Sequence, residues 1–335
     1  MGLAGAIPQK ELFRRRIPCK RLRMKPRLTT PDGTPASALC FGTMQFGGRA
    51  NPLESQGMYE ASRAAGVNFF DTAHVYTDGA SETMLGRFAG PEREQLIIAT
   101  KCGYIGGCGA ENIRRQFDES RQRLNLDMVD ILYLHRWDGE ADLTQSFSAL
   151  AALRDAGQIR HAGLSNFAAW QVMKAAAIAA RFDLKISILQ PMYSLVKRQA
   201  EVEILPMAVA EGFAVAPYSP LGGGLLTGKY ASGKCKGRLS EDDRYATRYG
   251  LGWMHETARD LAALAAGEQR APATLAVAWA ARHPAVTAPI ISARTTSQLA
   301  PSLAALDHPL SDELYERISA LSPTPPPATD RLEEA

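Results

Sequence analysis

The chain has 335 residues, 46% of them hydrophobic, which is enough for one large α/β domain or two ordinary ones. The formal net charge is only +3 and the charges are mixed in sign, which argues against an extended nucleic-acid-binding surface. No apolar run is long enough to span a bilayer, the start lacks a secretory apolar core, and the five cysteines lack zinc-site spacing, so we expect a cytoplasmic protein with reduced thiols and no membrane partner.

Residues 1–27 differ in composition from the rest of the chain, with nine basic residues against one acid, Glu11. We interpret this stretch as a disordered basic arm. Three alternatives stay open: a tether to nucleic acid or membrane, an organelle transit peptide, or a start codon placed too early, with Met24 as the true start.

From residue 27 onward the chain reads as a single domain, which we place at 28–322. Residues 27–37 contain Pro31-Asp32-Gly33 and predict a turn or hairpin that closes one end of the domain. Short apolar strands are then expected at 39–44, 68–73, 96–103, 128–135, 159–165, 186–192, 213–219 and 286–292. Segments of helical period lie between them, among them 54–65, 111–124, 143–156, 168–180, 202–211 and 257–266, and residues 275–280 have the composition of a buried helix face.

This alternation is typical of βαβ units and a parallel sheet, and eight units in about 250 residues predict an α/β fold of the (β/α)8 TIM-barrel type with a C-terminal helical extension. A doubly wound open sheet is the main competitor, but no G-x-G-x-x-G follows the first strand. The polar, glycine-rich break at 229–250 predicts a loop that covers the active site. The proline-rich tail, 323–335, is expected to be disordered.

Four polar side chains follow predicted strands in a way that would bring them to one rim of a barrel: Asp71, Tyr76, Lys101 and His135. A buried Asp71 needs a cation nearby to stay ionised, and Lys101 is the candidate. The ammonium would in turn lower the pKa of Tyr76, so that the phenol could protonate a carbonyl oxygen held by His135. Such a general-acid step contributes roughly 10²- to 10⁴-fold in rate.

The order strand-Asp71, Tyr76, strand-Lys101, strand-His135 strongly resembles the aldo-keto reductases, of the bacterial type. The resemblance extends from about residue 39 to 307 and includes Phe41-Gly-Thr-Met44, Gly163-Leu-Ser-Asn-Phe167, Gln190-Pro-Met-Tyr-Ser194, Tyr218 to Lys229, and Ile290-Ile-Ser-Ala-Arg294. It implies a (β/α)8 barrel that binds NADPH across its mouth and reduces aldehydes or ketones, with Tyr76 as the proton donor, Lys101 and Asp71 tuning it, and His135 orienting the substrate.

The resemblance also implies the cofactor contacts. Ser165, Asn166 and Gln190 would bind the nicotinamide carboxamide, Tyr218 would stack on the ring, and Ser219, Leu221 and Gly223 would lie along the pyrophosphate. Arg294 and Gln298 would contact the adenosine end, where a guanidinium suits the 2′-phosphate of NADPH. The remaining expected cofactor contacts are Thr43, Met44, Asp71, Lys229, Ser292 and Ser302.

Three features depart from the family's pattern: Ser292, the pair Pro301-Ser302, and Arg136-Trp137-Asp138 after the histidine. Ser292 replaces a common Gly, and Pro301 and Ser302 replace the Glu and Asn beside the adenine, so adenine recognition is expected to be weaker or rearranged. Trp137 follows the histidine strand, and we give equal weight to a wall of the substrate pocket and to simple packing. His74, Cys102, Cys108 and His135 lack the spacing of a metal site.

Two rival functions stay open beside the carbonyl reductase. Lys101 could be the Schiff-base nucleophile of an aldolase, although Asp71 would keep it charged and so disfavours this. Alternatively, the chain could be a non-catalytic binding subunit that senses the redox state of the cofactor, as some family members resemble channel-associated partners. The substrate, the reaction direction and the oligomeric state cannot be read from the sequence.

Overall fold

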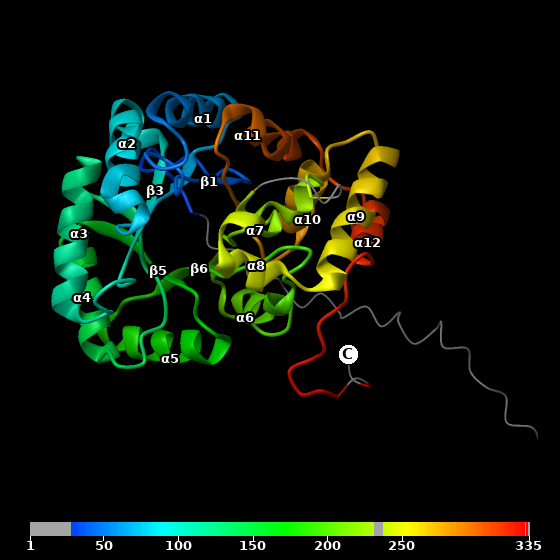
Figure 1. Cartoon of the computed structure of the whole chain (residues 1–335). Helices are drawn as coiled ribbons and strands as arrows, with labels where there is room; N and C mark the ends of the chain where they lie inside the picture. The colour runs from blue at the N-terminus through cyan, green and yellow to red at the C-terminus, as the bar shows by residue number, and fades with distance from the viewer. Residues whose placement is uncertain (1–27, 231–236, 332, 334–335) are drawn as a thin grey trace, which may run out of the picture.

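The structure, a computed structural model, describes residues 28–230, 237–331 and 333 (Figure 1). Eight parallel strands form one sheet in the order β7-β6-β5-β4-β3-β2-β1-β8. Their bounds are β1 Cys40–Gly42, β2 Phe69–Asp71, β3 Ile97–Cys102, β4 Val129–Leu134, β5 Ile159–Ser165, β6 Ile186–Gln190, β7 Ala214–Val215 and β8 Ile290–Ile291. All eight lie within the predicted strand ranges.

The sheet closes on itself between its first and last strands. β1 pairs in parallel with both β2 and β8. Between β7 and β8 the amide of Thr287 donates to the carbonyl of Val215 at 2.8 Å, and that of Ile290 donates to Pro217 at 2.8 Å. The predicted barrel is therefore confirmed, and its seam is formed by the two-residue strands β7 and β8 and the residues next to them.

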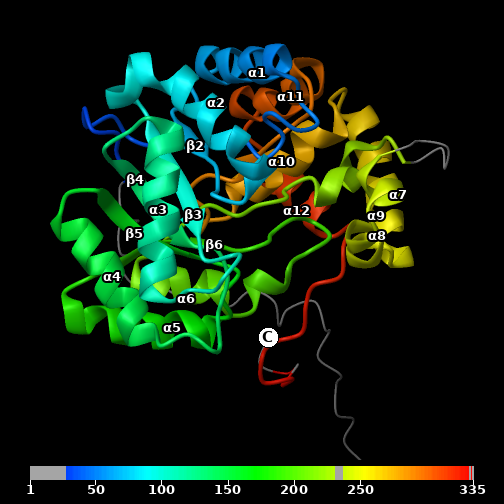
Figure 2. The ribbon, with the colours of Figure 1, turned by 60° about the vertical axis from the view of Figure 1, so that its left-hand side comes forward.

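Helices surround the barrel, as the two views show (Figures 1 and 2). The helices are α1 Pro52–Ala64, α2 Ala80–Ala89, α3 Ala110–Leu124, α4 Leu143–Asp155, α5 Ala169–Ala179, α6 Ile204–Glu211, α7 Arg238–Glu241, α8 Asp243–Tyr249, α9 Gly252–Gly267, α10 Pro272–Arg282, α11 Thr296–Leu303 and α12 Asp312–Ser319. None of the helices in the described ranges combines the length and apolarity needed to cross a membrane.

The helix starts follow local chemistry. The side chain of Asn51 accepts a hydrogen bond from the amide of Glu54, and Pro52 occupies the first turn, so α1 begins there. Asp142 caps α4 in the same way through the amide of Thr144. These caps satisfy backbone donors that an uncapped helix would leave without partners.

The strands are apolar on both faces because the barrel has two cores. Side chains such as Phe69, Ile131 and Ile188 fill the barrel interior, whereas Phe70, Leu132 and others pack under the helices. A strand between two apolar layers reads as a continuous apolar run, and this explains why the sequence revealed the strands so clearly.

The predicted hairpin lies at the amino ends of the strands. Thr29 and Pro35 form an antiparallel bridge, and the Asn68 amide group, just before β2, donates to the carbonyl of Pro35 at 2.9 Å. Arg160 in β5 donates to the carbonyl of Thr29 at 2.7 Å. The hairpin therefore closes the end of the barrel opposite to the one where β2, β3 and β4 end.

The break at 229–250 differs from the predicted loop. Its described part contains the short helices α7 and α8, so the segment is largely helical from residue 238. The predicted arm, 1–27, and residues 231–236 lie outside the described residues. In the tail, residues 323–331 belong to no helix or strand.

Candidate active site

The four predicted rim residues come together at the carboxyl ends of the strands. Asp71 is the last residue of β2, Lys101 is the fifth of the six residues of β3, and His135 directly follows β4. Tyr76 begins a 3-10 turn, Tyr76–Gly79, after β2. Parallel strands of a closed barrel deliver their ends to the same mouth, which is why sequence positions 71 to 135 meet here.

Lys101 is the centre of this group and is 1% exposed. Its Nζ donates to Asp71 Oδ1 at 2.5 Å, to the carbonyl of Thr72 at 2.7 Å and to the Tyr76 hydroxyl at 3.3 Å. All three protons of the ammonium therefore have acceptors, which is the condition for a charged lysine inside a protein.

The pair of Lys101 and Asp71 is electrostatically coupled. Burial lowers the pKa of Lys101, but the Asp71 carboxylate and the Tyr76 phenol outweigh burial and leave the pKa above its ordinary value. Burial also raises the pKa of Asp71, against the opposing effect of Lys101 and of the Gln190 amide. Lys101 thus remains an ammonium at neutral pH.

Tyr76 differs from the expectation. Its pKa is raised, because burial favours the neutral phenol more strongly than the Lys101 ammonium favours the phenolate. The ammonium also lies over the face of the ring, 4.8 Å from its centroid. The nearby cation can be expected from the sequence, but the burial of the phenol depends on the fold. At neutral pH, Tyr76 consequently carries its proton.

His135 is 7% exposed and lies edge-on to Tyr76, with ring centroids 5.9 Å apart. Burial, followed by the charges of Lys101 and Arg136, lowers the pKa of His135 to about 3. The imidazole is therefore neutral and has one N–H to donate. Its Nδ1 is buried and has no hydrogen-bond partner within the described ranges.

Four expected nicotinamide contacts form a hydrogen-bonded chain beside this group. The Tyr218 hydroxyl donates to Asn166 Oδ1 at 2.6 Å, and Asn166 Nδ2 donates to Ser165 Oγ at 3.1 Å and to the carbonyl of His135 at 2.9 Å. Ser165 Oγ donates to the carbonyl of Gln190, whose amide group donates to Asp71 Oδ2 at 2.9 Å. The structure thus links this set to the rim residues.

The glycine-rich loop after β7 has an unusual backbone. Ser219 has a φ of 61°, and three consecutive glycines, 222–224, have φ values of 56°, 65° and 98°. Glycine adopts this left-handed region without steric cost. Lys229 lies against the loop, because a Cβ on Gly224 would be 3.4 Å from the lysine Nζ. Leu221 directly precedes the glycines and is partly buried.

Thr43 and Met44 lie just after β1. Thr43 is fully buried, and its Oγ1 bonds with the Ser81 hydroxyl at 2.7 Å and with the carbonyl of Asp71 at 3.2 Å. Its side chain therefore supports the strand ends from within. Met44 is partly exposed.

The residues expected at the adenosine end follow β8. Gln298 Oε1 accepts from the amide of Arg294 at 3.3 Å, and the Ser292 hydroxyl is buried without a partner in the described part of the chain. Ser302 on α11 is 1% exposed, and its hydroxyl is likewise buried without a partner in the described part of the chain.

Sequence reasoning missed a carboxylate in this region. Glu241 on α7 forms ion pairs with Arg294 at 3.3 Å and with Arg49, from the loop after β1, at 3.2 Å. It lies in the segment that was expected to cover the site. The three residues are almost 250 positions apart at the extremes, and no local sequence signal connects them.

Two aromatic side chains, Trp137 and Tyr104, belong to the loops that follow β4 and β3. Trp137 packs edge-on against Phe167 and Trp170, both with centroids 5.4 Å away, and Trp170 is 61% exposed. Tyr104, which no sequence motif singles out, has its ring centroid 4.9 Å from that of His135. Whether Trp137 lines a substrate pocket or only packs stays a prediction.

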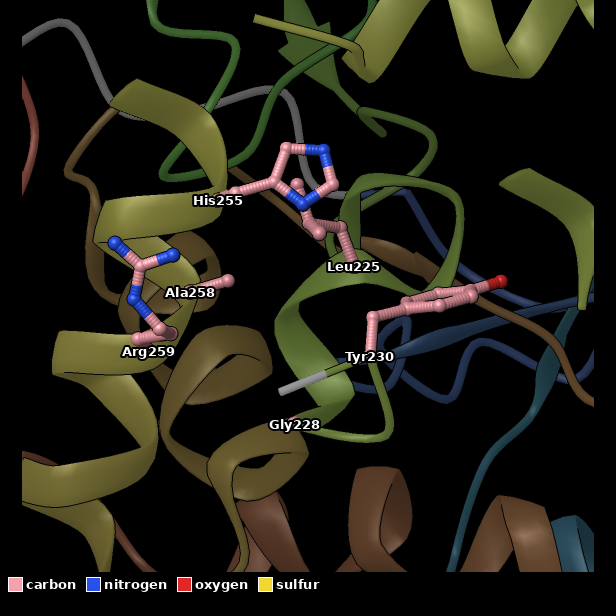
Figure 3. Close-up of a pocket in the computed structure, with 6 residues that line it drawn as sticks. All are labelled: Leu225, Gly228, Tyr230, His255, Ala258 and Arg259. Carbon is pink, nitrogen blue, oxygen red and sulfur yellow. The ribbon is translucent and has the colours of Figure 1, made fainter. Parts of the chain in front are cut away.

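A small pocket lies elsewhere, between the loop after β7 and α9 (Figure 3). It is lined by Leu225, Gly228, Tyr230, His255, Ala258 and Arg259. None of the four rim residues contributes to it. Because it has no contact with the buried charges at the mouth, we do not regard it as the catalytic site.

Comparison with known proteins agrees with this geometry. The model of the aldo/keto reductase family matches residues 38–323. A probable voltage-gated potassium channel subunit beta of Oryza sativa subsp. japonica is 32% identical over 321 residues, covering 89% of this chain and 97% of that protein. The uncharacterized oxidoreductase YrpG of Bacillus subtilis is 31% identical over 314 residues, covering 88% and 94%. Norsolorinic acid reductase stcV of Emericella nidulans is 31% identical over 312 residues, covering 85% and 78%. The chain belongs to the aldo/keto reductase family.

Proposed function

We propose that the protein is an NADPH-dependent reductase of aldehydes or ketones in which Tyr76 donates the proton. The observation that carries this proposal is the position of Lys101 Nζ, within hydrogen-bonding distance of both Asp71 and the Tyr76 hydroxyl. The partner would be a small carbonyl compound. The family membership and the relative named a norsolorinic acid reductase support the same class of reaction.

The chain offers suitable groups for the cofactor. In the glycine-rich turn at 222–224 the amides of Gly222 and Gly224 donate within the loop, which leaves the Gly223 amide for a phosphate oxygen, and Lys229 adds a positive charge beside the turn. Arg294 can bind a 2′-phosphate with paired hydrogen bonds, and this favours NADPH over NADH. The bound cofactor would supply the hydride.

The chain's own residues would supply the proton and the orientation. Tyr76 carries its proton at neutral pH, because its pKa is raised by burial. As that proton leaves toward a carbonyl oxygen, negative charge develops on the phenol 3.3 Å from the Lys101 ammonium, which stabilises it. Neutral His135 would donate its single N–H to the same carbonyl oxygen.

The test is turnover of NADPH with an aromatic aldehyde such as 4-nitrobenzaldehyde, followed at the nicotinamide absorbance. Tyr76→Phe should lower kcat by roughly 10²- to 10⁴-fold and leave the Kd for NADPH within about twofold. A parallel titration with NADH tests the cofactor preference. Turnover that persists in Tyr76→Phe would refute the assignment of the proton donor.

A second candidate is a cofactor-sensing subunit of a larger assembly. It is favoured by one observation, the 32% identity to a protein named a potassium channel subunit beta. Stable co-purification with a membrane protein, together with turnover too slow to compete with cofactor exchange, would support it. Fast multiple turnover without a partner would argue against it.

The aldolase alternative is disfavoured by the charge on Lys101. A Schiff-base lysine attacks as the neutral amine, but Asp71 holds the pKa of Lys101 above its ordinary value in spite of burial. Borohydride trapping of a carbonyl compound on Lys101 would revive this alternative.

A further inference from the structure

The turn that follows Tyr76 has a strained backbone. Thr77 and Asp78 have φ values of 46° and 51°, and Gly79 follows with 93°. Residues with side chains rarely adopt positive φ, and two in succession persist only where the surroundings enforce them. Because the turn begins at Tyr76, whatever holds it also fixes the position of the phenol.

Arg123, near the end of α3, is one such support. Its Nη1 donates to the carbonyl of His74 at 3.0 Å, two residues before Tyr76. Its guanidinium also packs against the far end of the turn, since a Cβ on Gly79 would lie 2.6 Å from Arg123 Nε. One side chain therefore touches the backbone on both sides of Tyr76.

Glu82, on α2, connects the same arginine to the lysine strand. It is completely buried, and its Oε2 pairs with Arg123 Nη1 at 3.2 Å. Its Oε1 accepts a hydrogen bond from Thr100 Oγ1 at 2.6 Å, and Thr100 directly precedes Lys101 in β3. The Glu82 carboxylate thus binds both Arg123, which contacts the turn at Tyr76, and the strand that carries Lys101.

This arrangement lies behind the site, on α2 and α3, which run side by side in both views (Figures 1 and 2). A second acid adds to it: Glu119 pairs with His74 at 2.6 Å and lies 3.7 Å from Arg123 Nη2. A buried carboxylate is costly unless its charge is compensated, and Arg123 provides that compensation. The buried Glu82 carboxylate therefore connects the turn that carries Tyr76 with the strand that carries Lys101, and the proton transfer depends on the distance between these two residues.

We infer that Arg123 and Glu82 are positioning residues that set the distance between the Tyr76 hydroxyl and Lys101 Nζ. This inference rests on the proposed function for its kinetic consequence. Without the pair the strained turn relaxes, and the phenol moves away from the ammonium. A displacement of about 1 Å in a catalytic group can cost roughly 10²-fold in rate.

The experiment compares Arg123→Lys, Glu82→Gln and Gly79→Ala with the control Arg114→Gln, which replaces an exposed arginine of the same helix. Arg123→Lys keeps the positive charge but loses the planar guanidinium that contacts both the His74 carbonyl and Glu82. Gly79→Ala adds a Cβ that would collide with the Arg123 side chain. Each variant is measured for kcat and KM, for the Kd of NADPH, for its unfolding midpoint and for the ¹³Cζ resonance of Tyr76, assigned by its absence in Tyr76→Phe.

We expect Arg123→Lys and Glu82→Gln to lower kcat by about 10- to 100-fold while KM and the Kd for NADPH stay within about twofold, because ligand contacts are untouched. The Tyr76 resonance should shift in these variants and in Gly79→Ala but not in Arg114→Gln. If Glu82→Gln does not fold, the other two variants decide the question.

Variants that lose only thermal stability, with kcat and the Tyr76 resonance unchanged, would overturn the inference and leave the pair a structural one. If the wild-type protein itself shows no turnover, the proposed function fails separately. The resonance then decides alone: a shift supports the positioning role and an unchanged resonance overturns it.

Discussion

Lys101 is the residue on which the site depends, because it is a buried ammonium with three acceptors and one countercharge. Asp71→Asn would leave that charge without compensation. We expect a loss of about 3–5 kcal/mol in the free energy of unfolding, together with a fall in the pKa of Lys101, since its main raising influence is removed. Urea unfolding measures the first effect.

The double variant Asp71→Asn/Lys101→Met is the control, because it removes the orphaned charge as well. It should be more stable than Asp71→Asn alone. A double variant as unstable as the single one would indicate that lost packing, and not the charge, causes the destabilisation.

His135 makes stability depend on pH. Its pKa is about 3 in the folded protein against an ordinary 6.5, so between these values the unfolded chain binds a proton that the folded protein excludes. Stability therefore falls as pH falls through this window, by roughly 2–3 kcal/mol between pH 6.5 and 4.5 from this residue. The loss of stability between the two pH values should therefore be smaller in His135→Gln than in the wild type by this amount, and unfolding curves measured at both pH values test it.

Which residues meet at the rim could be predicted from the sequence more reliably than their pKa values. Asp71, Lys101 and His135 could be placed on one rim because each ends an apolar run. The direction of the Tyr76 pKa could not be predicted, because it depends on how deeply the phenol is buried. The burial of the Ser302 hydroxyl likewise follows from how α11 packs.

Among the elements, α7 connects two loops at the mouth of the barrel. Glu241 joins the loops after β1 and β8, and Arg294, the residue proposed for the 2′-phosphate, is one of its two partners. We expect Glu241→Gln to increase the rates of both binding and release of NADPH. The change in Kd should be small, because a partly exposed pair contributes only about 0.2–1 kcal/mol.

Stopped-flow fluorescence of NADPH binding measures both rates. Asp243→Asn, an exposed acid at the start of α8, is the matched control and should leave them unchanged. Unaltered rates in Glu241→Gln would show that α7 does not restrict access to the cofactor site.

The helical elements were predicted unevenly. Long amphipathic segments such as those of α3 and α4 were predicted almost to the residue, whereas α2, α7, α8, α11 and α12 were not identified by range. α7 and α8 have four and seven residues and derive their helical form from tertiary contacts that local periodicity does not contain. The strands were predicted best, since both of their faces are buried.

In the molecule as a whole, the proposed catalytic residues lie at one end of the barrel and a stabilising cluster of charges lies at the other. At the end opposite the rim residues, fully buried Asp130 pairs with Arg93 at 2.7 Å and with Arg160 at 2.8 Å, and Arg160 also holds the hairpin through Thr29. Asp130→Asn should lower the free energy of unfolding by about 3–5 kcal/mol, because it leaves two arginines without their carboxylate.

The same variant should keep the kcat and KM of the wild type below its unfolding temperature, since barrel chemistry is located at the other end. Thermal unfolding and steady-state kinetics on one preparation test both statements. A reduced kcat in a folded Asp130→Asn would show that the two ends are coupled.

The shortness of β7 and β8 has a consequence for how this molecule moves. β7 and β8 are joined by only a few backbone hydrogen bonds, so the loss of one removes a larger share of the local pairing than it would in the six- and seven-residue strands on the far side. We therefore expect the barrel to open transiently along the seam between β7 and β8. The segments 219–229 and 292–298, which follow these two strands, would then separate and close together. A dinucleotide could enter between them while the longer strands stay paired.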